Sequence, residues 1–195
     1  MKTHQSAQRL RFPKAKKFTV YLFSIALLLV GGGAAVRGQS VLDSFNPNAN
    51  GIVSVIVVQP DGKILIGGYF TALTNAANVA VTRNHIARLY ADGSLDTAFN
   101  PNAGGTVYAI AVQSDGKVLV GGQFGTIGGQ SRPQIGRLDA TTGAADSWTP
   151  NPNLGVEAIA VQSDGKILMG GAFSTVGNNT HVRIARLDAI TGVAE

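Results

Sequence analysis

The chain contains no cysteine among its 195 residues. This absence excludes a disulfide framework, a thiolate metal site and a cysteine nucleophile. Charged residues are sparse as well, at 14%, and there is a single tryptophan. The three histidines (His4, His85 and His181) have no metal-ligand spacing, and no Gly-x-Ser-x-Gly, His-Glu-x-x-His or Walker-type phrase occurs. We therefore expect no catalytic residues, no metal site and no cofactor, and we do not expect an enzyme.

The basic residues are distributed unevenly along the chain. Residues 1–38 hold seven of the sixteen Lys and Arg residues and no acidic residue. Residues 39–195 carry nine basic and eleven acidic residues, so the formal net charge of +5 comes from the N-terminal segment. The remainder has no excess of positive charge with which to bind phosphates, and we expect no nucleic-acid partner.

The N-terminal segment, residues 1–38, has the three parts of a secretory signal peptide: a basic stretch, an apolar run and a region of small residues. Cleavage after Gly38 would leave residues 39–42 as a linker, and cleavage after Ala35 is an alternative. In a second alternative the signal is an uncleaved anchor that contacts the membrane only through residues 18–36. Either way, we expect the rest of the chain to be secreted, periplasmic or at the cell surface.

One twelve-residue phrase occurs three times in the rest of the chain. Its copies read QPDGKILIGGYF, QSDGKVLVGGQF and QSDGKILMGGAF, beginning at Gln59, Gln113 and Gln162. A spacing of about 50 residues indicates a repeat architecture, in which each unit buries its faces against its neighbours. The phrase divides the chain into predicted units at residues 43–95, 96–145 and 146–195.

Each unit predicts an antiparallel arrangement of short strands. The inner strand, such as VSVIVVQ at 53–59, is apolar on both faces and should be covered on both sides. By strict alternation, Val53, Val55 and Val57 would share one face of it. A hairpin turn, a second strand ending in two glycines, a third strand and a short fourth strand follow. The residues expected to form the turns are Asp61, Gly62, Asp115, Gly116, Asp164 and Gly165.

Four antiparallel strands per unit of this length are typical of a β-propeller blade. A β-solenoid has shorter coils without the hairpin, and a sandwich would not repeat the phrase in register. We expect an all-β fold of three propeller blades, an incomplete ring, preceded by an N-terminal hydrophobic signal helix.

The repeated motifs resemble known propeller families. The two glycines that close the second strand resemble those of Kelch-type blades. The fuller pattern, with Asp-x-Phe-Asn-Pro-Asn before it and Ile-Ala-Arg-Leu after it, is similar to the bacterial delta-60 repeat propellers over about residues 43–195. This resemblance implies an exported or cell-surface propeller with no settled reaction and no catalytic residue to transfer. Trp148-Thr149 replaces Phe-Asn in the third unit, and the first unit has extra residues around 74–84.

Three blades are fewer than the four to eight of a closed propeller. We therefore expect the chain to be the N-terminal fragment of a longer protein, whose further blades would complete the ring in cis. Assembly of several copies into one ring is the alternative.

Residues that recur in every unit are expected to be structural. The arginines of the third strands need partners, which the aspartates that open the units can provide. The predicted ion-pairing set is Arg88, Arg137, Arg186, Asp43, Asp96 and Asp146. Calcium ligation by the turn aspartates is an alternative role for those residues.

Function is expected where the units differ. The second position of the inner strand reads Ser54, Tyr108 and Glu157, and these three are the candidate ligand-binding residues. The loops at 74–84, 125–134 and 174–183 are second candidates, and these two sets suit a scaffold or recognition module for a protein or glycan surface. The alternative is a propeller-type polysaccharide hydrolase or lyase with its site on missing blades.

Overall fold

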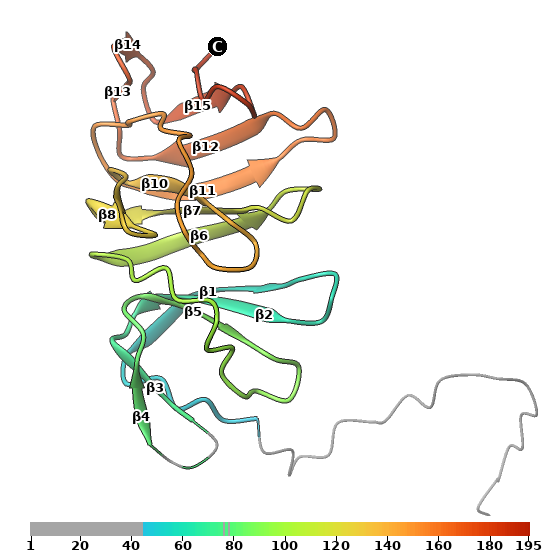
Figure 1. Cartoon of the computed structure of the whole chain (residues 1–195). Helices are drawn as coiled ribbons and strands as arrows, with labels where there is room; N and C mark the ends of the chain where they lie inside the picture. The colour runs from blue at the N-terminus through green and yellow to red at the C-terminus, as the bar shows by residue number, and fades with distance from the viewer. Residues whose placement is uncertain (1–44, 76, 78) are drawn as a thin grey trace, which may run out of the picture. The chain divides into compact units, whose positions relative to one another are not determined.

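The computed structural model describes residues 45–75, 77 and 79–195, which lie in a compact unit (Figure 1). The predicted signal helix, the linker at 39–42 and Asp43 lie outside the described residues. The described part is all-β, and no helix within it could span a membrane.

Three three-stranded antiparallel sheets follow one another along the chain, and we refer to them as blades 1 to 3. Each runs from inner to middle to outer strand in an unbroken antiparallel order. The bounds are β1 Ile52–Val58, β2 Ile64–Tyr69 and β5 Ile86–Leu89; β6 Thr106–Val112, β7 Val118–Gln123 and β10 Ile135–Leu138; β11 Val156–Val161, β12 Ile167–Gly171 and β15 Ile184–Leu187. The three sheets do not close into a ring within the described residues.

The fourth strand of each blade is reduced to one bridge with the outer strand: Leu89 to Leu95, Leu138 to Ala145 and Leu187 to Ala194. Between the middle and outer strands each blade carries a small hairpin. The hairpin strands are β3 Ala72–Thr74 and β4 Ala80–Thr82, β8 Thr126–Ile127 and β9 Gln130–Ser131, and β13 Thr175–Val176 and β14 Asn179–Thr180.

The Asp-Gly-Lys segment forms the turn between inner and middle strands. In blade 1, the Gly62 amide donates to the Gln59 carbonyl at 2.9 Å, and the Asp61 carboxylate accepts from the Lys63 amide at 3.1 Å. Gly62 has φ +82°, a left-handed conformation that a side chain would disfavour. Blades 2 and 3 repeat both hydrogen bonds, so the repeated phrase specifies the same tight turn each time.

A β-bulge interrupts every inner strand near its start. The pairing register shifts between Val53 and Val55, and the same shift occurs between Val107 and Ala109 and between Val156 and Ala158. The alternation predicted for the inner strand is therefore wrong at its first residue. Because the extra residue rotates the chain, Val107 lies on the same face as Ile110, where both approach Gly67.

The hydrophobic core lies between successive blades. Leu65 and Ile86 of blade 1 pack in one buried cluster with Val107, Ile110 and Phe124 of blade 2. An equivalent cluster joins blade 2 to blade 3. The first glycine of each pair lets the blades approach closely: a Cβ built on Gly67 would lie 2.5 Å from Val107 Cγ1.

Candidate functional site

Several exposed residues that differ between blades lie at the end of the sheets that carries the paired glycines. The inner strand begins there, the middle strand ends there and the outer strand begins there. We call this end the variable rim. It is defined by the bulge residues Ser54, Tyr108 and Glu157 and by the residues after the paired glycines, Tyr69, Gln123 and Ala172. The repeated Asp-Gly-Lys turns lie at the opposite end.

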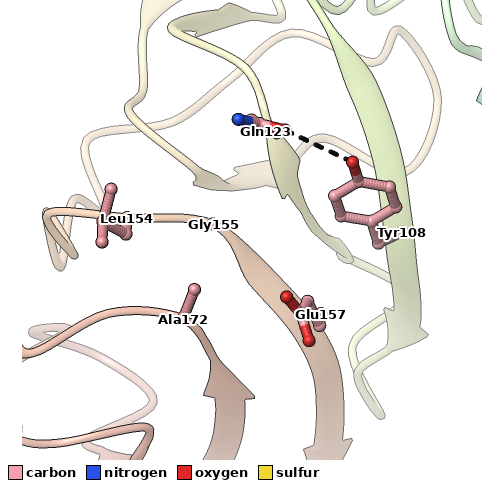
Figure 2. A pocket seen from close by; sticks show the side chains of 6 residues that line it. All are labelled: Tyr108, Gln123, Leu154, Gly155, Glu157 and Ala172. Atoms are coloured by element: carbon pink, nitrogen blue, oxygen red, sulfur yellow. Dashed lines mark hydrogen bonds between the residues drawn. The ribbon is translucent and has the colours of Figure 1, made fainter.

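An open hollow of about 450 Å³ lies at the variable rim between blades 2 and 3 (Figure 2). Tyr108 of β6 and Gln123 of β7 form one side, and the Tyr108 hydroxyl lies 3.4 Å from Gln123 Oε1. Glu157 of β11 lies opposite them. The remaining lining residues are Leu154, Gly155 and Ala172. This volume falls within the range of about 300–1,000 Å³ that small-ligand sites occupy.

The bulge places Tyr108 and Glu157 in the hollow. Each is the extra residue of its inner strand, and both side chains are exposed. The second glycine of each pair makes room for the bulged backbone: a Cβ on Gly122 would lie 2.1 Å from the Thr106 carbonyl oxygen, and one on Gly171 would lie 2.2 Å from that of Gly155. The paired glycines therefore position the hollow as well as packing the blades.

The side chains around the hollow suit a ligand rich in hydroxyl groups. The Glu157 carboxylate accepts hydrogen bonds only, the Gln123 amide both donates and accepts, and the Tyr108 phenol does the same. The Tyr108 ring adds an apolar face, and Leu154 and Ala172 add further apolar surface. Of the six described lining residues only Glu157 is acidic, so a pair of carboxylates is not assembled there.

Ser54, the third predicted binding residue, is the exposed bulge residue of β1 and does not line this hollow. The structure thus brings Tyr108 and Glu157 together and leaves Ser54 apart. Strand β4 and the hairpins β8–β9 and β13–β14 fall within the loops taken as second candidates, and β3 overlaps the first loop only at Thr74. None of these hairpin residues lines the hollow.

A second set of blade-specific residues at the rim was missed by the sequence reasoning. His85, Gln134 and Arg183 precede the outer strands and have φ between +64° and +66°, a conformation uncommon outside glycine. The His85 ring lies 5.8 Å from the Tyr69 ring, and its Nδ1 is 3.2 Å from the Gly68 carbonyl oxygen. Comparing the residue before each Ile-x-Arg-Leu segment across the repeats would have found this set.

The recurrent charged residues form ion pairs within each blade. Arg88 Nε lies 2.9 Å from Asp96 Oδ2, and Arg137 Nε lies 2.7 Å from Asp146 Oδ2. Arg186 pairs with Glu195 at 3.0 Å, a partner that the sequence analysis did not name. The acidic residue that opens a unit in the sequence therefore closes the preceding blade in space.

Lysines after the turns reinforce these pairs. Lys63 lies 3.7 Å from Asp96, and Lys117 lies 3.4 Å from Asp146. Burial raises the pKa of the Asp96 carboxyl, but the hydrogen bond and positive charge of Arg88 outweigh that effect and hold the pKa below its ordinary value. A hollow of about 400 Å³ near Lys63 and Arg88 is therefore lined by charges that already have partners.

The turn carboxylates have a local role as well. Asp61, Asp115 and Asp164 each accept a hydrogen bond from the amide two residues later. Within the described part of the chain, no group of three or more His, Cys, Asp or Glu side chains is placed to hold a metal ion.

Three successive antiparallel blades that pack face to face, each with the same turn between its inner and middle strands, define a β-propeller repeat protein. The chain belongs to the β-propeller family described as domain of unknown function DUF5122, whose model matches residues 59–99, 113–147 and 162–192. No curated protein matches the chain.

Proposed function

We propose that the blades form a non-catalytic recognition module that binds a glycan or a protein surface through the variable rim. The observation that carries this proposal is the hollow between blades 2 and 3, where Tyr108, Gln123 and Glu157 converge. Ala172 occupies in blade 3 the position that Gln123 occupies in blade 2, and Ser54 occupies in blade 1 the position of Tyr108 and Glu157. The blades therefore share a framework and differ in the side chains that they present at this rim. Differences between repeats in the side chains exposed at one rim of a shared framework are typical of a binding surface.

A neutral glycan fits the hollow better than an acidic one. An exposed tyrosine ring can cover the apolar face of a sugar, while the Gln123 amide and the Glu157 carboxylate bind its hydroxyl groups. The carboxylate would repel a uronic acid at short range. Protein loops rich in serine and threonine hydroxyls share this chemistry and are the second class of ligand.

Isothermal titration with neutral and uronic-acid oligosaccharides of matched length tests this function. We expect a neutral oligosaccharide to bind the wild-type chain and Tyr108→Ala to weaken that binding by at least about tenfold, because stacking is lost. Tyr90→Ala is the matched control, since Tyr90 is also an exposed tyrosine but lies beside Lys63 at the opposite rim. Equal losses in both variants, or tighter binding of the uronic acids, would count against the proposal.

A propeller-type hydrolase or lyase is the second candidate, and the exposed carboxylate of Glu157 in the hollow favours it. Hydrolysis with two carboxylates would need a second acid about 5–10 Å away. Incubation with the same oligosaccharides and measurement of new reducing ends distinguishes the two candidates. Recognition alone predicts no release, and release abolished by Glu157→Gln would favour the enzyme.

We also infer that the protein is an exported bacterial propeller of the delta-60 type. The basic, apolar and small-residue order of residues 1–38 supports export, and the repeated Asp-Gly-Lys and paired-glycine phrase supports the repeat type. The N-terminal sequence of the product recovered outside a bacterial cytoplasm tests export. A product starting at Gln39 or Val36 is expected, whereas an unprocessed product in the cytoplasm would contradict this inference.

A further inference from the structure

In blade 1, an asparagine side chain holds the first residues of the hairpin that follows the middle strand. Asn50 Oδ1 accepts hydrogen bonds from the Thr71 amide at 2.8 Å and from the Ala72 amide at 3.0 Å. Asn50 Nδ2 donates to Thr71 Oγ1 at 2.9 Å. One carbonyl oxygen therefore satisfies two adjacent backbone amides at the start of this hairpin.

Blade 3 repeats this arrangement with its own asparagine. Asn153 Oδ1 accepts from the Ser174 amide at 2.9 Å and from the Thr175 amide at 3.1 Å, and Asn153 Nδ2 donates to Ser174 Oγ at 3.0 Å. An asparagine side chain is acetamide joined to the backbone through its methyl carbon. In two blades, therefore, this pair of amides binds an acetamide group.

Blade 2 keeps the backbone of this arrangement without the side chain. Gly104 stands where blades 1 and 3 have asparagine, and its amide donates to the Thr126 carbonyl at 2.9 Å. The Asn50 amide makes the equivalent bond to the Ala72 carbonyl at 3.1 Å, and blade 3 repeats it. Gly104 is thus held against its hairpin as the asparagines are, but it contributes no acceptor to the hairpin amides.

The amides of Gly125 and Thr126 correspond to those of Thr71 and Ala72. The Arg132 amide donates to the Gly125 carbonyl at 3.0 Å, so these two residues form a hydrogen-bonded pair of the hairpin. Thr126 belongs to the next pair, which is not hydrogen-bonded, and its amide points away from β9. Within the described part of the chain, neither amide of blade 2 has the acceptor that its counterparts have.

The space around these two amides is accessible. Gly104, Gly125 and Thr126 are exposed, and a Cβ built on Gly125 would meet no atom of the described residues within 4 Å. Thr126 Oγ1 lies 2.5 Å from the position of a Cβ on Gly104, so this hydroxyl borders the place of the asparagine side chain. A threonine there is compatible with an acetamide group, because Thr175 accompanies Asn153 in blade 3.

The amide pair lies at the variable rim, next in the chain to a residue of the hollow between blades 2 and 3. Gly125 and Thr126 follow shortly after Gln123, which lines that hollow with Tyr108. The hollow suits the hydroxyl groups and the apolar face of a sugar ring, whereas the amides suit a carbonyl oxygen. A hexosamine that carries an N-acetyl group offers both kinds of group in one sugar.

We propose that the Gly125 and Thr126 amides bind the acetamido carbonyl of an N-acetylated neutral glycan, whose sugar ring occupies the hollow at Tyr108. The placement of the ring rests on the glycan recognition proposed above, whereas the acetamide site rests on the hairpin alone. The acetamido N–H can donate to Thr126 Oγ1, as an asparagine amide donates to a hydroxyl in the other two blades.

A neutral carbonyl suits this site better than an anion. A carboxylate could also accept from two adjacent amides, but the group held in blades 1 and 3 is an uncharged carboxamide. The Glu157 carboxylate of the nearby hollow also disfavours a negatively charged ligand.

Isothermal titration with two trisaccharides of the same linkage, one of N-acetylglucosamine and one of glucose, tests the proposal. We expect the N-acetylated trisaccharide to bind the wild-type chain roughly tenfold more tightly, because two amides donate to its acetamido carbonyl. Gly104→Asn supplies the side chain that blades 1 and 3 carry and should remove this preference. Gly104→Asn/Thr126→Ala copies Asn50 and Ala72 of blade 1 and should do the same without the neighbouring hydroxyl.

Gly129→Asn is the matched control and should keep the preference. It makes the same exchange in the same hairpin, where a new Cβ would meet no described atom within 4 Å and the φ of +78° is one that asparagine tolerates. The urea midpoint of Gly104→Asn/Thr126→Ala should be no lower than that of the wild type, because the new side chain makes the bonds that Asn50 makes. A lost preference would then not reflect unfolding.

Free acetamide gives a test that does not depend on any glycan. Titration of the isotope-labelled protein with acetamide should shift the amide resonances of Gly125 and Thr126. The amides of Thr71 and Ala72 should not shift, because Asn50 already occupies them. Gly104→Asn should abolish the shifts in blade 2.

The outcomes separate this proposal from the function on which it partly rests. Equal binding of the two trisaccharides, or a preference that survives both Gly104 variants, would overturn the acetamide site and leave glycan recognition intact. Acetamide that shifts the Thr71 amide as strongly as the Gly125 amide would overturn the site as well. Loss of all trisaccharide binding while acetamide still shifts Gly125 would instead overturn the glycan as the ligand.

Discussion

At the scale of single residues, burial decides how much each repeated ion pair contributes to the stability of the fold. Arg88 and Asp96 have side chains only 4% and 3% exposed, so their pairing removes two charges from water together. Lys117 also pairs with an aspartate, but it keeps contact with solvent. Recurrent charged residues of the repeat can therefore form ion pairs that contribute very different amounts to stability.

We expect Arg88→Met to lower the free energy of unfolding by about 3 kcal/mol, because Asp96 is left as a buried carboxylate without its main partner. Lys117→Met removes an exposed partner of Asp146 and should cost about 0.5 kcal/mol. Urea denaturation of both variants measures the difference. Similar losses in the two variants would show that burial does not set the weight of these pairs.

The carboxylates of the blades should make the fold sensitive to acid. Hydrogen bonds from Lys166 and Arg186 lower the pKa of Glu195. Burial raises the pKa of Asp96 and Asp146, but the hydrogen bond and charge of Arg88 hold that of Asp96 below its ordinary value. Hydrogen bonds from the Trp148 amide and from Arg137 do the same for the pKa of Asp146. A carboxyl with a lower pKa in the folded state stabilises that state when ionised.

The urea midpoint should therefore be level from neutral pH to about pH 5 and should fall progressively below about pH 4. Denaturation curves at a series of pH values measure this profile. Replacing Asp96 by Asn should make the acid decline shallower. A midpoint that rises on acidification would contradict the assignment of these pairs.

Some residue roles could be predicted from the sequence and others could not. The turn at Asp61 and Gly62 could be predicted, because an aspartate followed by a glycine favours a tight turn through its local backbone preferences alone. The partner of Arg186 could not be inferred in that way, because it depends on the outer strand bringing Glu195 back beside it. The left-handed conformation of His85 could not be predicted either, because the residue at that position is not a glycine.

At the scale of strands, the two adjacent glycines serve different contacts. The first, such as Gly121, lies under a valine of the next blade, and the second, Gly122, lies against the bulged backbone of its own inner strand. The bulge was not predicted because Val53 and Val55 are both apolar, so the sequence shows no break in the alternation there. The position of the bulge depends on how the inner strand pairs with the two glycines of the middle strand, and not on the alternation of apolar residues.

Gly121→Ala should destabilise the fold by about 1–3 kcal/mol, because the new Cβ would lie 2.8 Å from Val156 Cγ1. Gly170→Ala, at the equivalent position of blade 3, meets nothing closer than 3.7 Å and should be neutral or slightly stabilising. Both should be measured by urea denaturation. Equal costs would contradict the packing of a valine over the first glycine.

At the scale of the whole molecule, the blades combine a shared framework with a varied rim. The repeated phrase was enough to predict three blades and their strand order, because the turns and the paired glycines recur in every unit. The hollow could be predicted only in part. Tyr108 and Glu157 were found by comparing repeats, whereas Gln123 and Leu154 join them through packing between neighbouring blades.

Amide chemical shifts of the isotope-labelled protein, recorded during titration with the tightest-binding neutral oligosaccharide of the panel, test the central claim most directly. Recognition at the variable rim predicts that the perturbed amides cluster around Tyr108, Gln123 and the segment 154–157. Perturbations clustered at the Asp-Gly-Lys turns, or no binding by any neutral oligosaccharide or serine- and threonine-rich peptide, would contradict it.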